Sequence, residues 1–309
     1  MLELATATSR SEPAPTPEPS APAERFDPFQ PLSPAQRARE MEGYLAHLRA
    51  QDGEIDWDAW TLPQRAARMQ RLRDEALDWQ GPLDRDAFYQ HFHRVGSPEV
   101  DLRTHWLILA ALANESERFG VEIETRELKR KGRDADPVMV YHVLQEDFHT
   151  HLLLEACRTA GLPGVTLLDP RRAHRWIIHA MSHLPDALRY VLIAVGEAIG
   201  TAVVKRLRDT VYLFEDPAVE ERLRSILDEI LDDERLHTVH CRTRLERWGL
   251  LAARWLLPLG AWVAVRTYPQ IAHLGLDHRS LLAEIRRGIE LPQGAEWVTR
   301  SPTPERNGA

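Results

Sequence analysis

The sequence contains two Glu-x-x-His motifs, Glu146 to His149 and Glu234 to His237. The three-residue spacing places the carboxylate and the imidazole of each motif on one face of a helix. Both motifs lie on the apolar stripe of a long helical segment, where an unpaired carboxylate is costly to bury. Because carboxylates and imidazoles are common ligands of divalent metals, two such pairs in one core predict a metal site.

A further glutamate precedes each motif in an otherwise apolar segment. Glu197 lies 37 residues before Glu234, and Glu115 lies 31 residues before Glu146. Glu117 is the alternative to Glu115, since the phase of that helix is defined only to a residue or two. The order Glu, Glu-x-x-His, Glu, Glu-x-x-His over four consecutive helices is typical of the di-metal sites of ferritin-like bundles.

Hard carboxylates with one imidazole per metal indicate two iron ions, with manganese as the alternative, and dioxygen chemistry favours iron. Two more histidines are candidates for an extra ligand. His142 lies one turn before Glu146, and His240 is its rival in the last helix. Asp147 and Asp233 are adjacent to motif glutamates, where a carboxylate can accept the N–H of a ligating imidazole.

Helix-start signals place these residues on four long helices. A proline in the first turn, next to a Ser or Asp, is typical of a helix N-terminus. Such signals precede the segments Leu102–Phe119, Val138–Ala160, 186–208 and 217–248. The sequence predicts an all-α, ferritin-like four-helix bundle, with extra helices at about 34–50, 61–79, 84–94, 250–266 and 279–289.

The ends of the chain differ from this helical region. Residues 1–33 are rich in proline and poor in apolar side chains, and they predict a disordered tail, as do residues 300–309. Residues 34–299 then form a single helical domain with its core at about 97–248. Within it, Lys129-Arg130-Lys131 predicts a solvated loop, and Arg171, Arg172 and Arg175 are predicted to face solvent.

Composition restricts the remaining functions. The 309 residues carry a net charge of −8, which argues against nucleic-acid binding. Two cysteines, Cys157 and Cys241, are too few for a disulfide framework and favour a reducing compartment. The apolar run Leu250–Val265 is interrupted and falls short of the roughly 20 residues of a membrane span. We therefore expect a cytoplasmic protein without membrane contact.

The motif order, the 88 residues between the motifs and the flanking helices resemble the diiron arylamine N-oxygenases, the p-aminobenzoate N-oxygenase family. The resemblance covers roughly residues 100–245. It implies an oxidoreductase with two iron ions that uses O2 to oxidise a small organic substrate, with N-oxygenation of an amine as the reaction. That family has an extra histidine four residues before its last motif glutamate. Ile230 occupies this position here, and the same spacing occurs instead at His142.

No nucleotide-binding glycine loop occurs, so the electrons are expected from an external donor or reductase. Two alternatives remain open: a diiron C–H hydroxylase or desaturase-like oxidase, and a metal-free helical ligand-binding protein whose carboxylates pair with arginines. A radical-generating reductase subunit is disfavoured because Leu153 replaces the tyrosine such a subunit would need. Iron-storage cages are shorter chains, and a homodimer is left open.

Overall fold

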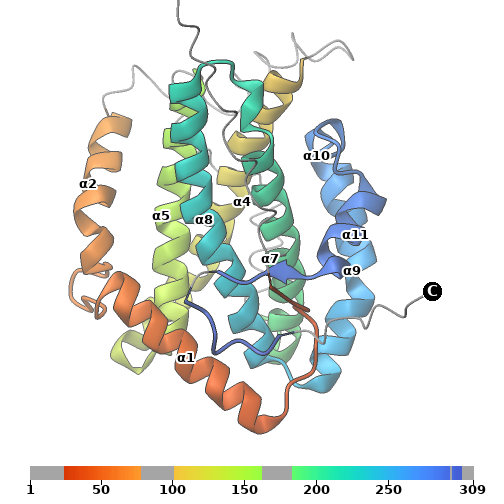
Figure 1. Cartoon of the computed structure of the whole chain (residues 1–309). Helices are drawn as coiled ribbons and strands as arrows, with labels where there is room; N and C mark the ends of the chain where they lie inside the picture. The colour runs from red at the N-terminus through yellow and green to blue at the C-terminus, as the bar shows by residue number, and fades with distance from the viewer. Residues whose placement is uncertain (1–23, 78–100, 162–182, 293, 301–309) are drawn as a thin grey trace, which may run out of the picture.

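Four long helices lie side by side at the centre of the computed structural model (Figure 1), which describes residues 24–77, 101–161, 183–292 and 294–300. They are α4 (Leu102–Lys131), α5 (Pro137–Thr159), α7 (Asp186–Asp209) and α8 (Pro217–Arg244). Helix α4 packs along α5, α7 along α8, and α5 against α8. Apart from two short strands, the regular structure of the described residues is helical, which confirms the predicted all-α class.

Aspartate caps begin three of these helices. Asp136 accepts a hydrogen bond from the backbone N–H of Val138 at the start of α5, and Asp216 accepts one from Ala218 at the start of α8. Both are followed by the predicted first-turn proline. Helix α4 begins after Asp101, and the signal predicted at residues 97–99 lies outside the described residues.

Two helix ends differ from the sequence prediction. Helix α4 continues beyond Phe119, so Lys129-Arg130-Lys131 forms its last turn rather than a loop. Cations there interact favourably with the C-terminal end of the helix dipole. Helix α8 ends at Arg244, before the predicted residue 248, because Leu245 is extended and α9 (Arg247–Thr267) begins two residues later.

The shorter helices cover two sides of the four central ones (Figure 1). On one side α1 (Pro34–Asp52) packs on α8, and α2 (Pro63–Leu77) packs on α5. On the other side α9 packs on α7, and α10 (Gln270–His273) and α11 (His278–Arg287) pack against α9. The helix predicted at 84–94 and the arginines at 171, 172 and 175 lie outside the described residues.

Part of the predicted N-terminal tail is ordered. Strand β1 (Arg25–Phe26) pairs antiparallel with β2 (Ile289–Glu290), which joins the two ends of the described chain. Phe26, Phe29 and Leu32 are buried. These three apolar side chains supply the buried surface that the proline-rich residues before them cannot. The prediction of disorder up to residue 33 is therefore wrong for residues 24–33, and residues 1–23 and 301–309 lie outside the described residues.

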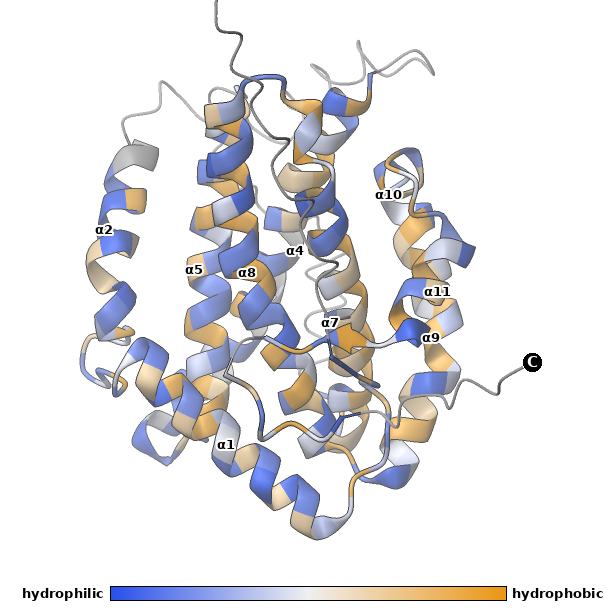
Figure 2. Ribbon diagram, viewed as in Figure 1, coloured by the Kyte–Doolittle hydropathy of each residue, from blue (hydrophilic) through white to orange (hydrophobic). Residues whose placement is uncertain are grey.

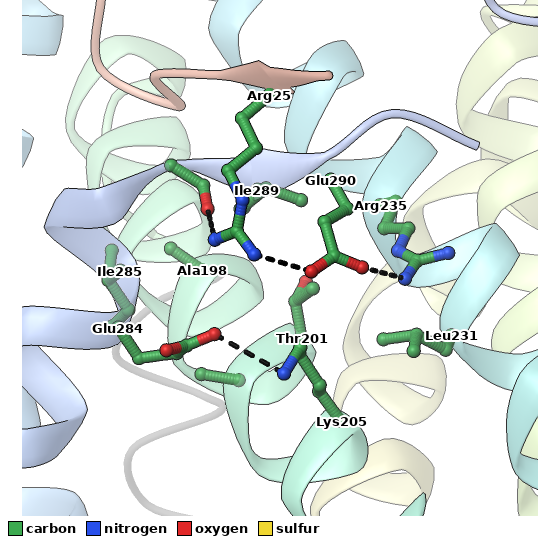
Figure 3. Close-up of a pocket in the computed structure, with 12 residues that line it drawn as sticks. Arg25, Ala198, Thr201, Lys205, Leu231, Arg235, Glu284, Ile285, Ile289 and Glu290 are labelled. Carbon is green, nitrogen blue, oxygen red and sulfur yellow. Dashed lines mark hydrogen bonds and ion pairs between the residues drawn. The ribbon is translucent and has the colours of Figure 1, made fainter. Parts of the chain in front are cut away.

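Ion pairs attach this small sheet to the central helices (Figure 3). Arg25 of β1 pairs with Glu290 of β2 at 2.5 Å, and Glu290 also pairs with Arg235 of α8 at 3.2 Å. Lys205 of α7 lies 3.4 Å from Glu284 of α11. These contacts hold the C-terminal segment against α7 and α8, the helices that carry Glu197 and Glu234.

Two described segments are long and apolar enough to cross a membrane by length and composition alone, Asp186–Leu213 and Arg247–Thr267. The apolar window of the first is 50% buried, as in a core helix, and that of the second is 22% buried. Helix α9 is thus longer than the sequence suggested, and Figure 2 shows it rich in hydrophobic residues. The core helix of a soluble protein can pass the same test of length and hydropathy, so two such helices are weak evidence for a membrane span.

Glycines control how closely α9 approaches α7. A Cβ atom at Gly260 of α9 would lie 2.6 Å from Val195 Cγ1 and 3.3 Å from Ile199 Cδ1, both on α7. Only glycine therefore allows this contact without displacement of the two helices. At Gly196 of α7, by contrast, an added Cβ would meet no described atom within 4 Å.

We predict opposite effects of alanine at these two glycines. Gly260→Ala should lower the free energy of unfolding by about 1–3 kcal/mol, because it overpacks the α7–α9 contact. Gly196→Ala should raise it by about 0.5–1 kcal/mol, because alanine is the better helix former and has room. Thermal and urea unfolding of the two variants checks this, and equal stabilisation of both would contradict the packing described here.

Candidate metal centre

Seven side chains from all four central helices converge inside the bundle. They are Glu117 on α4, His142, Glu146 and His149 on α5, Glu197 on α7, and Glu234 and His237 on α8. Among the described residues, their ligand atoms form two groups, each with all atoms within 4.8 Å of one another. Glu146 belongs to both groups, so two metal positions would share its carboxylate.

The first group joins α5, α7 and α8. His237 Nδ1 lies 2.8 Å from Glu146 Oε1 and 3.8 Å from Glu197 Oε2. His142 Nε2 lies 3.4 Å from an oxygen of each of the same two glutamates. Two imidazole nitrogens and two carboxylates therefore surround one point.

The second group joins α4, α5 and α8. His149 Nδ1 lies 3.3 Å from Glu234 Oε1 and 4.0 Å from Glu146 Oε2, and Glu117 completes the group from α4. The sequence favoured Glu115 over Glu117 for this role. Glu115 lies two residues earlier on α4, and its side chain is outside the described part of the structure.

Unpaired buried atoms indicate that these groups fit metal ions. His149 Nδ1, His237 Nδ1 and Glu234 Oε1 are buried and make no hydrogen bond to a described residue. Although His237 Nδ1 lies close to Glu146, the two are not aligned as donor and acceptor. Buried polar atoms normally have a partner, so atoms left without one are suited to be ligands. The four carboxylates also match the charge of two divalent ions.

The far nitrogen of each motif histidine is held by the opposite helix. His149 Nε2 lies 2.9 Å from Asp233 Oδ2, and His237 Nε2 lies 2.9 Å from Gln145 Oε1. An acceptor at Nε2 fixes the proton there and leaves the Nδ1 lone pair for a metal. Asp233 was expected in this role, whereas Gln145 was missed. Gln145 precedes Glu146 just as Asp233 precedes Glu234, and this shared offset is the sequence signal that could have found it.

Asp147 does not have the role that the sequence suggested. Its carboxylate lies 2.8 Å from Arg73 Nη2 on α2, and it is partly exposed rather than directed at a motif histidine. A residue directly after Glu146 is rotated by about 100° around the helix, which turns Asp147 away from the bundle axis.

The flanking helices supply a second layer around the site. Arg65 of α2 donates to Asp233 Oδ2 and to Asp52 Oδ1, both at 2.5 Å. Gln145 Nε2 donates to Asp52 Oδ2 at 2.8 Å. The orientation of His149 and His237 thus depends on α1 and α2 as well as on the four central helices.

This layer sets the charges of Asp233 and His149. Burial alone would raise the pKa of Asp233, but the charge of Arg65 and the hydrogen bond from His149 hold that pKa well below its usual value. Burial alone would lower the pKa of His149, but the hydrogen bond to Asp233 and the negative charge of the adjacent Glu234 raise it to about 10. Without a metal, His149 therefore carries a proton at neutral pH.

The crowded carboxylates also retain protons when no metal is bound. Burial, with a contribution from Glu197, raises the pKa of Glu117 to about 7. Burial and the charge of Glu117 raise the pKa of Glu234 well above its usual value. The pKa of His237 is lowered, first by burial and then by the neighbouring His142, so this ring stays neutral. Protons therefore replace part of the positive charge that metal ions would bring.

The two candidates for an extra histidine ligand occupy different places. The His142 ring stacks on His237 with centroids 3.9 Å apart, and it belongs to the first ligand group. His240 Nδ1 lies 3.4 Å from His142 Nδ1, and His240 Nε2 accepts a hydrogen bond from Arg244. His240 therefore lies behind His142 and in neither described group. His151 contacts the Asp147 carbonyl and belongs to neither described group.

Comparisons of the chain with protein-family models, curated proteins and solved structures give no match.

We predict that metal binding releases protons. Below pH 10 a metal must displace the proton of His149, so the affinity for Zn²⁺ should rise about tenfold per pH unit between roughly pH 7 and 9. Calorimetric titration with Zn²⁺ in buffers of different ionisation enthalpy measures both the affinity and the number of protons released.

Asp233→Asn is the control for this prediction. The amide no longer stabilises the charged imidazole, so fewer protons should be released and the pH slope should flatten. An affinity of the unaltered chain that is independent of pH in this range would contradict the assignment of His149 as a ligand.

Proposed function

We propose that the chain is a ferritin-like diiron oxygenase that uses O2 to oxidise a small organic substrate. The observation that carries the proposal is the membership of Glu146 in both ligand groups, which gives a pair of adjacent metal positions. One carboxylate from each of α4 and α7 and a Glu-x-x-His pair from each of α5 and α8 correspond to the ligand arrangement of di-iron and di-manganese bundles.

The ion pairs of the described residues argue against the metal-free alternative. That alternative requires arginines to neutralise the buried glutamates. Glu146, Glu197 and Glu234 have only histidines as described ion-pair partners, while the nearby Arg65 pairs with Asp52 and Asp233. Among the described residues these three carboxylates have no arginine partner, and two divalent ions would supply positive charge there.

Iron is the proposed metal, with manganese as the alternative. Bound there, it would supply the activation of O2 and the transfer of one oxygen atom to the substrate. The ligand set of carboxylates and imidazoles suits either metal, and the activation of O2 favours iron.

The protein's own residues orient the metal ligands and form a cavity for the substrate. Asp233 and Gln145 fix the two motif imidazoles, and Arg65 holds Asp233 in its charged form. A cavity of about 490 Å³ borders His142, Glu197 and Glu234. Its volume lies within the range of about 300–1,000 Å³ for small-molecule sites. The substrate would therefore lie directly beside the metal pair.

N-oxygenation of an amine is the proposed reaction because of the resemblance of the motif order to the arylamine N-oxygenases. One oxygen atom of O2 becomes the hydroxylamine oxygen, and the other leaves as water. An external reductase or small reductant supplies the two electrons, together with two protons from solvent. A C–H hydroxylase would use the same centre and differs only in the product. We propose a cytoplasmic location, because the two cysteines are too few for a disulfide framework and favour a reducing compartment.

The function is tested by anaerobic loading with ferrous iron, followed by exposure to O2 and a series of aromatic amines. We expect two iron ions per chain, a new near-ultraviolet absorption band on oxygenation, and a hydroxylamine or nitro product. Glu146→Ala should lose paired binding of both ions, and Glu197→Ala should lose one. Each removes a ligand that a metal of the first group needs.

Glu221→Ala is the matched control, because Glu221 is exposed on α8. Full iron content in Glu146→Ala would contradict the shared carboxylate. A hydroxylated carbon product would replace N-oxygenation by the alternative reaction, and iron content without any oxygen uptake would contradict the oxygenase.

The two extra histidines give a separate prediction. His142→Ala should retain the fold and most of the iron but change the absorption spectrum and lower turnover at least tenfold, since it removes a ligand. His240→Ala should change both much less, because His240 contacts His142 but belongs to neither described ligand group. A larger effect of His240→Ala than of His142→Ala would contradict this and would make His240 of α8 the extra ligand.

A further inference from the structure

A second cavity lies next to the one at the metal centre. It has a volume of about 540 Å³ and lies between α4, α7 and α9. The two cavities share four lining residues: Glu117, Leu192, Gly196 and Gly200. They are therefore adjacent compartments that meet at Glu117 of α4 and at this part of α7.

The second cavity is apolar and reaches the surface. Apart from Glu117, the described residues that line it are aliphatic, glycine, one threonine and one tyrosine. Leu192 on α7 and Leu256, Leu259 and Val263 on α9 line it and are also 37–57% exposed. Its mouth thus lies between α7 and α9 and is itself hydrophobic.

Two glycines of α7, Gly196 and Gly200, line both cavities. An added Cβ at Gly196 would meet no described atom within 4 Å, and one at Gly200 would meet only Glu234 Oε2, at 3.4 Å. Gly120 of α4, which lines the cavity at the metal centre, also has no described atom within 4 Å of an added Cβ. Glycine is unfavourable inside a helix, and helix contact explains it only at Gly260. At Gly120 and Gly196 a side chain would extend into space free of described atoms, and at Gly200 it would approach Glu234. Gly196 is itself exposed, at the edge of both cavities.

We propose that the two compartments hold one elongated, largely apolar substrate with a single polar end. This inference rests on the proposed function. The apolar body would lie between α4, α7 and α9, pass Gly196, and place the polar end beside His142 and Glu197. The lining supports this polarity, because His142, Glu146, Glu197 and Glu234 line only the cavity at the metal centre, whereas the described lining of the second cavity is mainly aliphatic.

The test is calorimetric titration of the full chain with n-alkanols from butanol to decanol, both with chelator and after loading with Zn²⁺. Affinity should rise about fourfold for each added methylene until the outer compartment is filled. Gly196→Leu should bind butanol normally but lose at least tenfold in affinity for decanol, because the leucine blocks the passage. Ala187→Leu, at an exposed position of the same helix, should change neither affinity.

A second variant avoids dependence on one substitution. Leu256→Trp narrows the mouth at a partly exposed position and should slow or weaken decanol binding without loss of metal. Affinities of the unaltered chain that do not depend on chain length, or equal effects of leucine at 196 and 187, would overturn the inference. Normal iron uptake with flat alkanol affinities overturns this inference alone, whereas the expected alkanol series without iron uptake overturns the proposed function alone.

Discussion

Four carboxylates and three imidazoles are gathered within one helical bundle, and this concentration of charge is the constraint on which the rest of the structure depends. Each buried carboxylate without a partner would be costly. In the metal-free chain the cost is reduced by protons, since burial raises the pKa values of Glu117 and Glu234 and His149 keeps its proton. Two divalent ions would provide the same compensation with fixed geometry.

The second layer explains why a bundle of four helices needs two more on one side. Arg65 forms ion pairs with both Asp52 and Asp233, and Asp233 in turn forms a hydrogen bond with His149. Removal of one partner of a buried ion pair strongly destabilises a protein, because the other charge stays buried without compensation. Helices α1 and α2 are therefore part of the site, although neither contributes a ligand. The other side has a different role, because α9 leaves an apolar compartment beside α7.

The sequence predicted the helical class, the four long helices and six of the seven converging residues, because these depend on local spacing. Motif residues three apart must share a helix face, and an aspartate followed by proline starts a helix wherever the helix packs. The donor from α4 was ambiguous because residues 115 and 117 differ by about 200° in helix phase. Only packing against the other helices determines which of them faces the axis.

Contacts between distant parts of the chain were beyond this reasoning. Arg65 is 168 residues from Asp233, and Gln145 is 92 residues from His237. Neither pairing produces a pattern in the nearby sequence. Gln145 and Asp233 each directly precede a motif glutamate, so the role of Asp233 suggests the same role for Gln145. The order of residues 24–33 was missed for the same reason, since Phe26 is buried against a strand at the other end of the chain.

The central claim is that one carboxylate is shared by two metal positions. Anomalous X-ray diffraction at the iron edge, from crystals of the full chain grown with ferrous iron without oxygen, tests it most directly. The account predicts two anomalous peaks per chain on either side of Glu146, one near His149 and Glu234 and one near His237 and Glu197. A single peak, or peaks that do not contact Glu146, would contradict it.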